Sequence, residues 1–149
     1  VISTIQNLVF EPMLPPPHVQ DLLRLPKRSK VYFQKKLLLL NGTPVAVDMS
    51  YTLYSLGKTL ARDLERQMTF PTLEQHGVMI DKIETMIEST HASYEVSEYL
   101  DVPLGHPLIA YSYKAYNDQD QPIVCGEALS RGDRLCYSVV IRRNADRNL

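Results

Sequence analysis

Residues 30–54 read KVYFQKKLLLLNGTPVAVDMSYTLY, and Asn41-Gly42 divides this stretch into two apolar-rich runs, 30–40 and 44–54. The dipeptide Asn-Gly readily supplies the two positive φ angles of a tight turn between antiparallel strands. Apolar runs of this length on both sides of such a turn are typical of paired strands. The stretch therefore predicts a β-hairpin, around which the neighbouring segments must pack.

Helices are predicted on both sides of this hairpin, because apolar residues recur there every three or four positions. Three prolines, 15–17, precede the first helix, and proline suits a helix start. A leucine stripe among charged residues marks the second helix. The expected helices cover residues 18–25, Leu56 to Leu64, a short turn at 69–76, and Ala92 to Leu100 with Ser93 or Thr90 as its cap.

The rest of the chain favours strands. The run from Val78 to Thr90 fits helical spacing and strand alternation equally, so its pattern leaves both open. Apolar and polar residues then alternate in three runs joined by turn-forming residues. These runs, Leu108–Tyr116, Gln121–Leu129 and Arg134–Arg142, predict a three-stranded antiparallel meander. The fold class expected is α+β, a mostly antiparallel sheet with flanking helices.

Composition limits the classes of protein to which the chain can belong. Its 149 residues, 44% hydrophobic and 22% charged, predict one domain over 1–149. A formal net charge of -1 argues against a domain that wraps nucleic acid over its own surface. The most apolar run, 37–40, is far shorter than the roughly 20 residues of a membrane span, so we expect no membrane partner. Because the first residue is Val1, we expect a piece of a longer protein.

Few side chains of the sequence suggest a catalytic or metal-binding role. Glycine-rich nucleotide-binding, zinc-protease, serine-hydrolase and CxxC patterns are absent from the sequence, so no catalytic residue and no cofactor are expected. His91 and Glu95 have the spacing of two ligands on one helix, but without a third ligand we expect no metal site. The tyrosines at 111, 113 and 116 suit a small-molecule pocket, an interface or plain sheet packing.

The two cysteines, Cys125 and Cys136, are too few for a disulfide framework and indicate a reducing cytoplasm. They lie on the two predicted strands that flank the last turn, where they could approach each other. Cysteine is also among the residues most often buried as a small apolar side chain. We therefore favour core packing for this pair.

Five features follow one another in a recognisable order. They are the helix ending LRLP (23–26), the hairpin VYFQKKLLLLNGTPVAVD (31–48), YLDVPLGHPL (99–108), YNDQDQPI (116–123) and SRGDR (130–134). In this order and spacing the sequence resembles the UTRA effector-binding domain of GntR-family transcription regulators, HutC subfamily. The resemblance covers nearly the whole chain.

The resemblance implies a chorismate-lyase-like fold that holds a small-molecule pocket and pairs with a second copy as a homodimer. It also implies that Val78 to Thr90 forms a strand. In such regulators an N-terminal winged helix-turn-helix domain, which these residues lack, binds operator DNA. Binding of a small-molecule effector to the present domain would alter that DNA binding.

Effector-site residues are also implied by the resemblance. Family members that take phosphorylated sugars hold the phosphate with an Arg-x-Arg pair, at positions that match Lys36 and Leu38 here. The family's Ser-Leu-Tyr, whose hydroxyls contribute to the same site, is replaced by Met68-Thr69-Phe70. Lys36 has a positive charge but cannot make the bidentate contact of an arginine guanidinium. Leu38 offers neither the charge nor the contact.

Other positions of the family pattern are kept only in part. The acidic residue after the hairpin is Asp48, whereas Val124 stands in place of a glutamate and Ser130 in place of a tyrosine. Arg131 and Asp133 match the family best, and we expect them to fix the last turn by a salt bridge or backbone hydrogen bonds.

These departures argue against a sugar phosphate as the effector, because a phosphate dianion needs several hydrogen-bond donors to offset its lost hydration. We expect a smaller or less charged, partly apolar effector. Lys36 and Asp48 would orient it, and Met68 and Phe70 would form an apolar wall. The alternative for Lys36 and Asp48 is a solvent-exposed ion pair across the hairpin.

Two other functions remain open. The first is a lyase acting on chorismate, in which Arg131 or Lys36 would work with Glu127 or Asp48. The second is a dimerisation module without ligand, to which a closed pocket filled by Phe70 would point. A sensor that binds its effector without transforming it is the function we favour.

Overall fold

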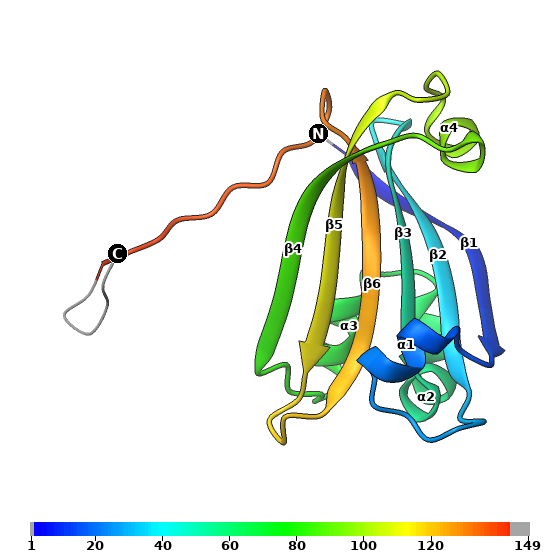
Figure 1. The fold of residues 1–149 in the computed structure, drawn as a ribbon, viewed down its shortest axis with the longest axis vertical. Coiled ribbons are helices and arrows are strands. Elements are labelled where there is room, and N and C mark those ends of the chain that lie inside the picture. The colour runs from blue at the N-terminus through cyan, green and yellow to red at the C-terminus, as the bar shows by residue number, and fades with distance from the viewer. Residues whose placement is uncertain (1, 144–149) are drawn as a thin grey trace.

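One antiparallel sheet forms the centre of the structure, a computed structural model that describes residues 2–143 (Figure 1). Within these residues the sheet has six strands in the spatial order β1-β2-β3-β6-β5-β4. The strands are β1 (Ser3–Met13), β2 (Val31–Leu40), β3 (Thr43–Leu53), β4 (Lys82–His91), β5 (Pro107–Tyr116) and β6 (Pro122–Arg131). The predicted α+β class with a mostly antiparallel sheet is confirmed.

The hairpin predicted from residues 30–54 is present as β2 and β3. Their register runs from Val31 opposite Leu53 to Leu40 opposite Thr43. Asn41 and Gly42 connect them with φ angles of 50° and 81°. Both angles are positive, which is the requirement that favours Asn-Gly in a two-residue turn.

The C-terminal strands are only partly as predicted. β5 and β6 form the expected hairpin, and the ambiguous run after Val78 becomes strand β4, as the family resemblance implied. The third meander strand, Arg134–Arg142, was a wrong prediction, because these residues belong to no strand. β6 is paired with β5 on one side and β3 on the other, so neither of its edges is free for a following strand.

Four helices in the described residues cover the two faces of the sheet. They are α1 (Pro17–Leu22), α2 (Tyr54–Leu64), α3 (Thr69–Gln75) and α4 (Tyr94–Leu100). α1 and α4 lie at opposite ends of one face, and α2 and α3 lie behind the sheet in Figure 1. All four fall within or close to the predicted ranges, and Ser93 caps α4 by accepting a hydrogen bond from the Val96 amide at 3.3 Å.

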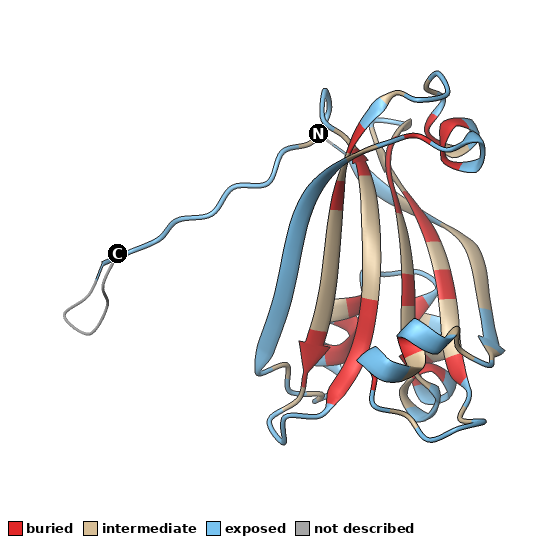
Figure 2. Cartoon of the chain, viewed as in Figure 1, coloured by how far each residue is buried: buried red, intermediate tan, exposed pale blue. Residues whose placement is uncertain are grey.

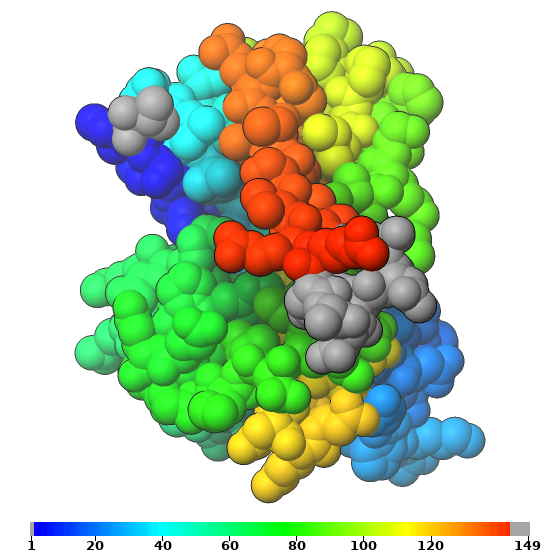
Figure 3. Space-filling view, turned by 90° about the vertical axis from the view of Figure 1, so that its left-hand side faces the viewer, coloured from blue at the N-terminus to red at the C-terminus, as the bar shows by residue number. Residues whose placement is uncertain are grey.

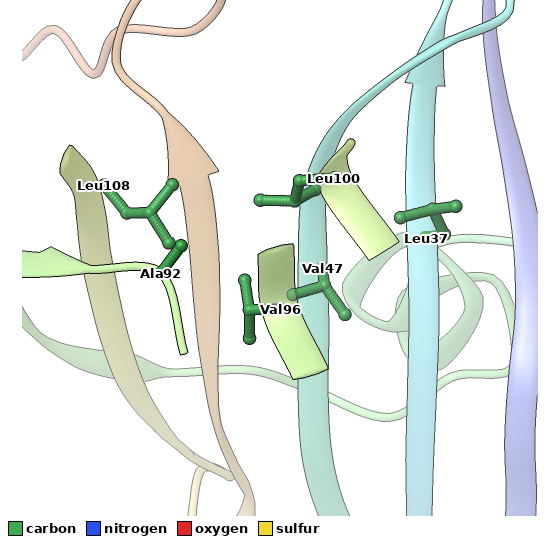
Figure 4. Packing of buried hydrophobic residues seen from close by; sticks show 6 residues of the cluster. All are labelled: Leu37, Val47, Ala92, Val96, Leu100 and Leu108. Atoms are coloured by element: carbon green, nitrogen blue, oxygen red, sulfur yellow. The ribbon is translucent and has the colours of Figure 1, made fainter. Parts of the chain in front are cut away.

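Buried side chains cluster where these helices meet the sheet (Figure 2). Figure 4 shows one cluster, in which Val96 and Leu100 of α4 pack over Leu37 and Val47. A second cluster joins α2 and α3 to β5 and β6 on the opposite face. Burial of these apolar side chains holds the helices to the sheet.

The cysteines differ from each other in environment. Core packing is the environment of Cys125, which is buried with α1 residues, but this prediction was wrong for Cys136, which is exposed and lies beyond the end of β6 in no strand. Both are free thiols.

Among residues 2–143, the structure contains no helix with the length and apolarity needed to cross a membrane.

Replacing Leu100 with Ala tests the packing of α4. Leu100 is fully buried, and Leu104 just beyond the helix is 70% exposed. We expect Leu100→Ala to lower the free energy of unfolding by about 2–5 kcal/mol, because it leaves a cavity, and Leu104→Ala to change it by less than about 0.5 kcal/mol. Urea denaturation of the two variants measures this difference, and similar losses in both would contradict the packing described.

Candidate functional site

A cavity of about 400 Å³ lies on the face of the sheet that carries α2 and α3. Its floor is formed by side chains of β2, β3, β5 and β6, and one wall by residues 68–71 at the start of α3. The opposite wall is Leu135, Cys136 and Tyr137, which follow β6. The segment after β6, in orange and red, runs away from the sheet in Figure 1 and points toward the viewer in Figure 3.

Most of the effector residues inferred from the family resemblance line this cavity. They are Lys36, Leu38, Asp48, Met68, Phe70 and Ser130. The structure does not bring Val124 to it. Val124 belongs to the same face of β6 as Ser130, but lies six residues earlier, where α2 and α3 cover the sheet and bury it completely.

Arg131 and Asp133 also lie outside the cavity. The Arg131 guanidinium donates from Nε and Nη2 to the two carboxylate oxygens of Asp133, at 3.1 Å and 2.8 Å. This two-pronged ion pair closes the turn after β6, the arrangement expected of these two residues. Backbone hydrogen bonds hold the same turn, because the Arg134 and Leu135 amides donate to the Arg131 carbonyl oxygen at 3.1 Å and 2.9 Å.

Lys36 is a buried cation on the cavity floor. Its side chain is only 3% exposed, and its Nζ donates to the Gln67 carbonyl oxygen at 2.6 Å and to Thr69 Oγ1 at 3.2 Å. These bonds tether the α2–α3 connection to the sheet. Burial lowers the pKa of Lys36 to about 8, against the opposing attraction of Asp48.

Asp48 is the register partner of Lys36 across the hairpin. Its carboxylate accepts hydrogen bonds from the Tyr113 hydroxyl, at 2.9 Å to Oδ1 and 3.2 Å to Oδ2. Burial raises the pKa of Asp48 to about 6, although the Tyr113 bond and Lys36 act in the opposite direction. The solvent-exposed ion pair considered for Lys36 and Asp48 is therefore wrong, since Lys36 is buried and each group has other partners.

Tyr113 reaches Asp48 because the strand beside it carries a glycine. Gly126 is the register partner of Tyr113, and a Cβ at this position would collide with the tyrosine hydroxyl. Phe70 closes the other side of the ring, edge-on at 5.5 Å between ring centroids. The sequence shows a tyrosine cluster at 111, 113 and 116, and the tertiary structure shows that Tyr111 and Tyr113 line the cavity.

Tyr137 also lines the cavity, and sequence reasoning did not single it out. Its ring stacks on Tyr111 with centroids 4.8 Å apart and planes inclined by 10°. Its hydroxyl lies 3.0 Å from Ser130 Oγ. The alternating pattern of 134–142 predicted a strand of the sheet. It therefore gave no indication that Tyr137 forms a wall of the cavity.

The cavity combines apolar walls with one buried amine, one carboxylate and several hydroxyls. Such a lining suits a small organic molecule that is fixed in orientation by a few polar contacts. Among the described residues, no cluster of three or more histidine, cysteine or acidic side chains could hold a metal ion. Fold and cavity together define an α+β domain with a cavity of a size and lining that suit a small organic molecule.

Comparison with known families agrees with that class. A family model described as "UTRA domain" matches residues 3–135. The chain belongs to the UTRA domain family.

Solved structures share the fold at low sequence identity. The ligand-binding domain of a putative GntR-family transcriptional regulator from Bordetella bronchiseptica has a TM-score of 0.84 at 18% identity, covering 95% of this chain and 90% of that one. The possible transcriptional regulator YydK from Bacillus subtilis has a TM-score of 0.86 at 17% identity, and the match covers 94% of this chain and 62% of the YydK chain. PhnF from Mycobacterium smegmatis has a TM-score of 0.86 at 13% identity, with coverage of 95% and 64%. The present chain thus spans under two thirds of YydK and PhnF.

Replacing Gly126 with Ala tests the contact between Tyr113 and Asp48. The added methyl group would collide with the Tyr113 hydroxyl and with the backbone carbonyl oxygen of Met49, so the tyrosine should be displaced, and loss of its hydrogen bond should raise the pKa of Asp48 further. A carboxyl titration followed by NMR measures that pKa. Gly132→Ala is the matched control, because its Cβ would meet Ile109 only at 3.6 Å, an ordinary contact distance. An unchanged Asp48 titration in Gly126→Ala would show that the glycine is not what admits the tyrosine.

Replacing Asp48 with Asn tests the burial of its charge. The folded chain has a pKa of about 6 for Asp48 against an ordinary value of 3.8, so between these pH values it holds a proton that the unfolded chain has released. The Asp48 contribution to the free energy of unfolding is therefore full below about pH 4 and is lost as the pH rises through 6.

We expect Asp48→Asn to remove this loss, so that stability falls less between about pH 4 and pH 6 than in the unchanged chain. Urea denaturation at both pH values measures it. The control is Glu74→Gln, which removes an exposed carboxylate on α3 and should leave the pH dependence as it was. The same fall in Asp48→Asn and in the unchanged chain would rule out a buried carboxylate.

Proposed function

We propose that this UTRA domain is the effector-sensing part of a bacterial GntR-type transcription regulator, of the HutC subfamily, acting in the cytoplasm. The observation that carries the proposal is the open cavity, in which a buried lysine and a carboxylate face apolar walls. Effector binding here favours one arrangement of a homodimer. That arrangement sets the spacing of two attached winged helix-turn-helix domains and so controls operator binding.

The effector we propose is partly apolar and carries no phosphate dianion. Among the described residues that line the cavity, Lys36 is the one cationic side chain, and two of its three N–H donors already bond to Gln67 and Thr69. A phosphate dianion would lose its hydration on entering this cavity, which offers too few hydrogen-bond donors to replace that water. Leu38, Met68 and Phe70 instead offer apolar contact, while Lys36, Asp48 and Ser130 can fix orientation.

The alternatives draw less support from the arrangement of side chains. The lyase hypothesis paired Arg131 or Lys36 with Glu127 or Asp48. Lys36 and Asp48 line this cavity, but Arg131 is paired with Asp133 outside it, and Glu127 lies on the opposite face. A module without ligand would have its pocket filled by Phe70, yet Phe70 packs edge-on against Tyr113 at the rim of about 400 Å³ of space.

A thermal-shift screen of metabolites tests the proposal. A ligand at 100 times its dissociation constant stabilises the chain by about 2.7 kcal/mol. We expect such shifts from partly apolar metabolites of low charge and none from sugar phosphates. Lys36→Met should abolish the shift, whereas Lys58→Met, the same change on an exposed lysine of α2, should keep it.

Two outcomes would overturn the proposal. One is a stabilising ligand whose shift is the same in Lys36→Met, which would place its site elsewhere. The other is turnover of the bound compound, with the conversion of chorismate into 4-hydroxybenzoate as the first reaction to assay.

A further inference from the structure

Two opposite charges face the cavity without pairing with each other. Lys36 and Asp48 are register partners on β2 and β3, and both line the cavity. Side chains at directly opposed strand positions lie close enough to interact. In the described part of the chain, however, the Lys36 ammonium group donates to Gln67 and Thr69. The Asp48 carboxylate accepts from Tyr113 instead. The fold therefore keeps a cation and an anion on neighbouring strands without an ion pair between them.

The partners of the two groups draw them in different directions. Lys36 is bound to the connection between α2 and α3. Asp48 is bound to Tyr113 of β5, which lies beyond β6 and therefore away from β2. Because Lys36 and Asp48 both line the cavity, one bound molecule can contact the two of them at once.

Each charged group has hydrogen-bonding capacity that the fold does not use. An ammonium group has three N–H donors, and Lys36 uses two of them. A carboxylate has about four acceptor positions, whereas the Tyr113 hydroxyl brings Asp48 a single proton. Buried charges with unfilled hydrogen bonds are unfavourable. A molecule that accepts from Lys36 and donates to Asp48 would therefore be stabilised in the cavity.

The two charges also determine which charge a ligand can carry. Burial moves the pKa of Lys36 to about 8 and that of Asp48 to about 6, so both groups are mainly ionised at neutral pH. A carboxylic acid would be attracted by Lys36 and repelled by Asp48, and an amine would meet the reverse. A molecule with both an ammonium and a carboxylate group is attracted by both residues and adds no net charge to the buried site.

The remaining lining suits an apolar group attached close to these charges. Leu38 lies on the same face of β2 as Lys36, and Met68 and Phe70 form the wall beside it. A cavity of about 400 Å³ has room for a large apolar side chain together with the polar groups. In an α-amino acid the ammonium group, the carboxylate and the side chain are attached to one carbon atom, which matches two neighbouring charges beside an apolar wall.

We propose that the effector of this domain is an α-amino acid with a large apolar side chain. Its carboxylate accepts the free N–H of Lys36, and its ammonium group donates to Asp48. Its side chain lies against Leu38, Met68 and Phe70. This inference rests on the proposed function, because it takes the same cavity as the effector site.

Isothermal titration calorimetry with matched compounds tests the inference on the unchanged chain. L-Leucine, L-methionine and L-phenylalanine are titrated first. The amino acid that binds most tightly is then compared with the acid that lacks its ammonium group and the amine that lacks its carboxylate. For L-leucine these analogues are 4-methylpentanoate and 3-methylbutylamine. We expect the amino acid to bind at least about tenfold more tightly than either analogue, because each analogue loses one charge-assisted hydrogen bond.

Two substitutions assign each charge of the ligand to its partner in the cavity. Lys36→Met should remove the advantage of the amino acid over the amine, because the carboxylate then has no cation to bind. Asp48→Asn should remove its advantage over the acid, because the ammonium group then has no anion to bind. The controls are Lys58→Met on α2 and Glu74→Gln on α3, which change exposed side chains and should keep both advantages.

Three results would overturn the inference. They are no binding of any of the three amino acids, an analogue that binds as tightly as its amino acid, and advantages that persist in both cavity variants. The first two are measured on the unchanged chain and do not depend on how well the variants fold. The metabolite screen separates these results from a failure of the proposed function. If another compound stabilises the unchanged chain but not Lys36→Met, the cavity remains an effector site and only its assignment to amino acids is wrong.

Discussion

Strand β6 is hydrogen-bonded on both of its sides, to β3 and to β5, and this placement joins two hairpins that are far apart in the sequence. The hairpin of β2 and β3 supplies Lys36 and Asp48, and the hairpin of β5 and β6 supplies Tyr113 and Ser130. Asp48 and Tyr113 are 65 residues apart in the chain but share a hydrogen bond because β6 pairs with both of their strands, so that β3 and β5 are separated by β6 alone. The candidate site exists only because of this insertion.

The site holds charge where charge is unfavourable. Lys36 and Asp48 are largely removed from water, and burial shifts the pKa of each toward its neutral form. Gln67, Thr69 and Tyr113 compensate in part through hydrogen bonds. Groups held in this way are expected where a protein binds a ligand, since the ligand can complete the polar contacts that the fold leaves unfinished.

The same insertion explains the course of the chain after β6. Because both edges of β6 are occupied, the residues that follow turn at the Arg131–Asp133 ion pair and leave the sheet. Leu135 to Tyr137 become a wall of the cavity, and the apolar residues beyond them remain exposed. One structural constraint thus accounts for the closed side of the site and for the exposed segment that follows it.

Local features of this protein were determined by its sequence alone. The Asn41-Gly42 turn, the helices and the cap at Ser93 depend on φ angles and hydrogen bonds within a few residues, and the period of two in a strand sets Lys36 and Leu38 on one face. The tertiary structure alone decided that Arg134–Arg142 is not a strand, that Val124 is covered by helices, and that Gly126 admits Tyr113 to Asp48. The physical reason is that strand order follows from competition for a limited number of sheet edges among distant segments, and no local propensity records its outcome.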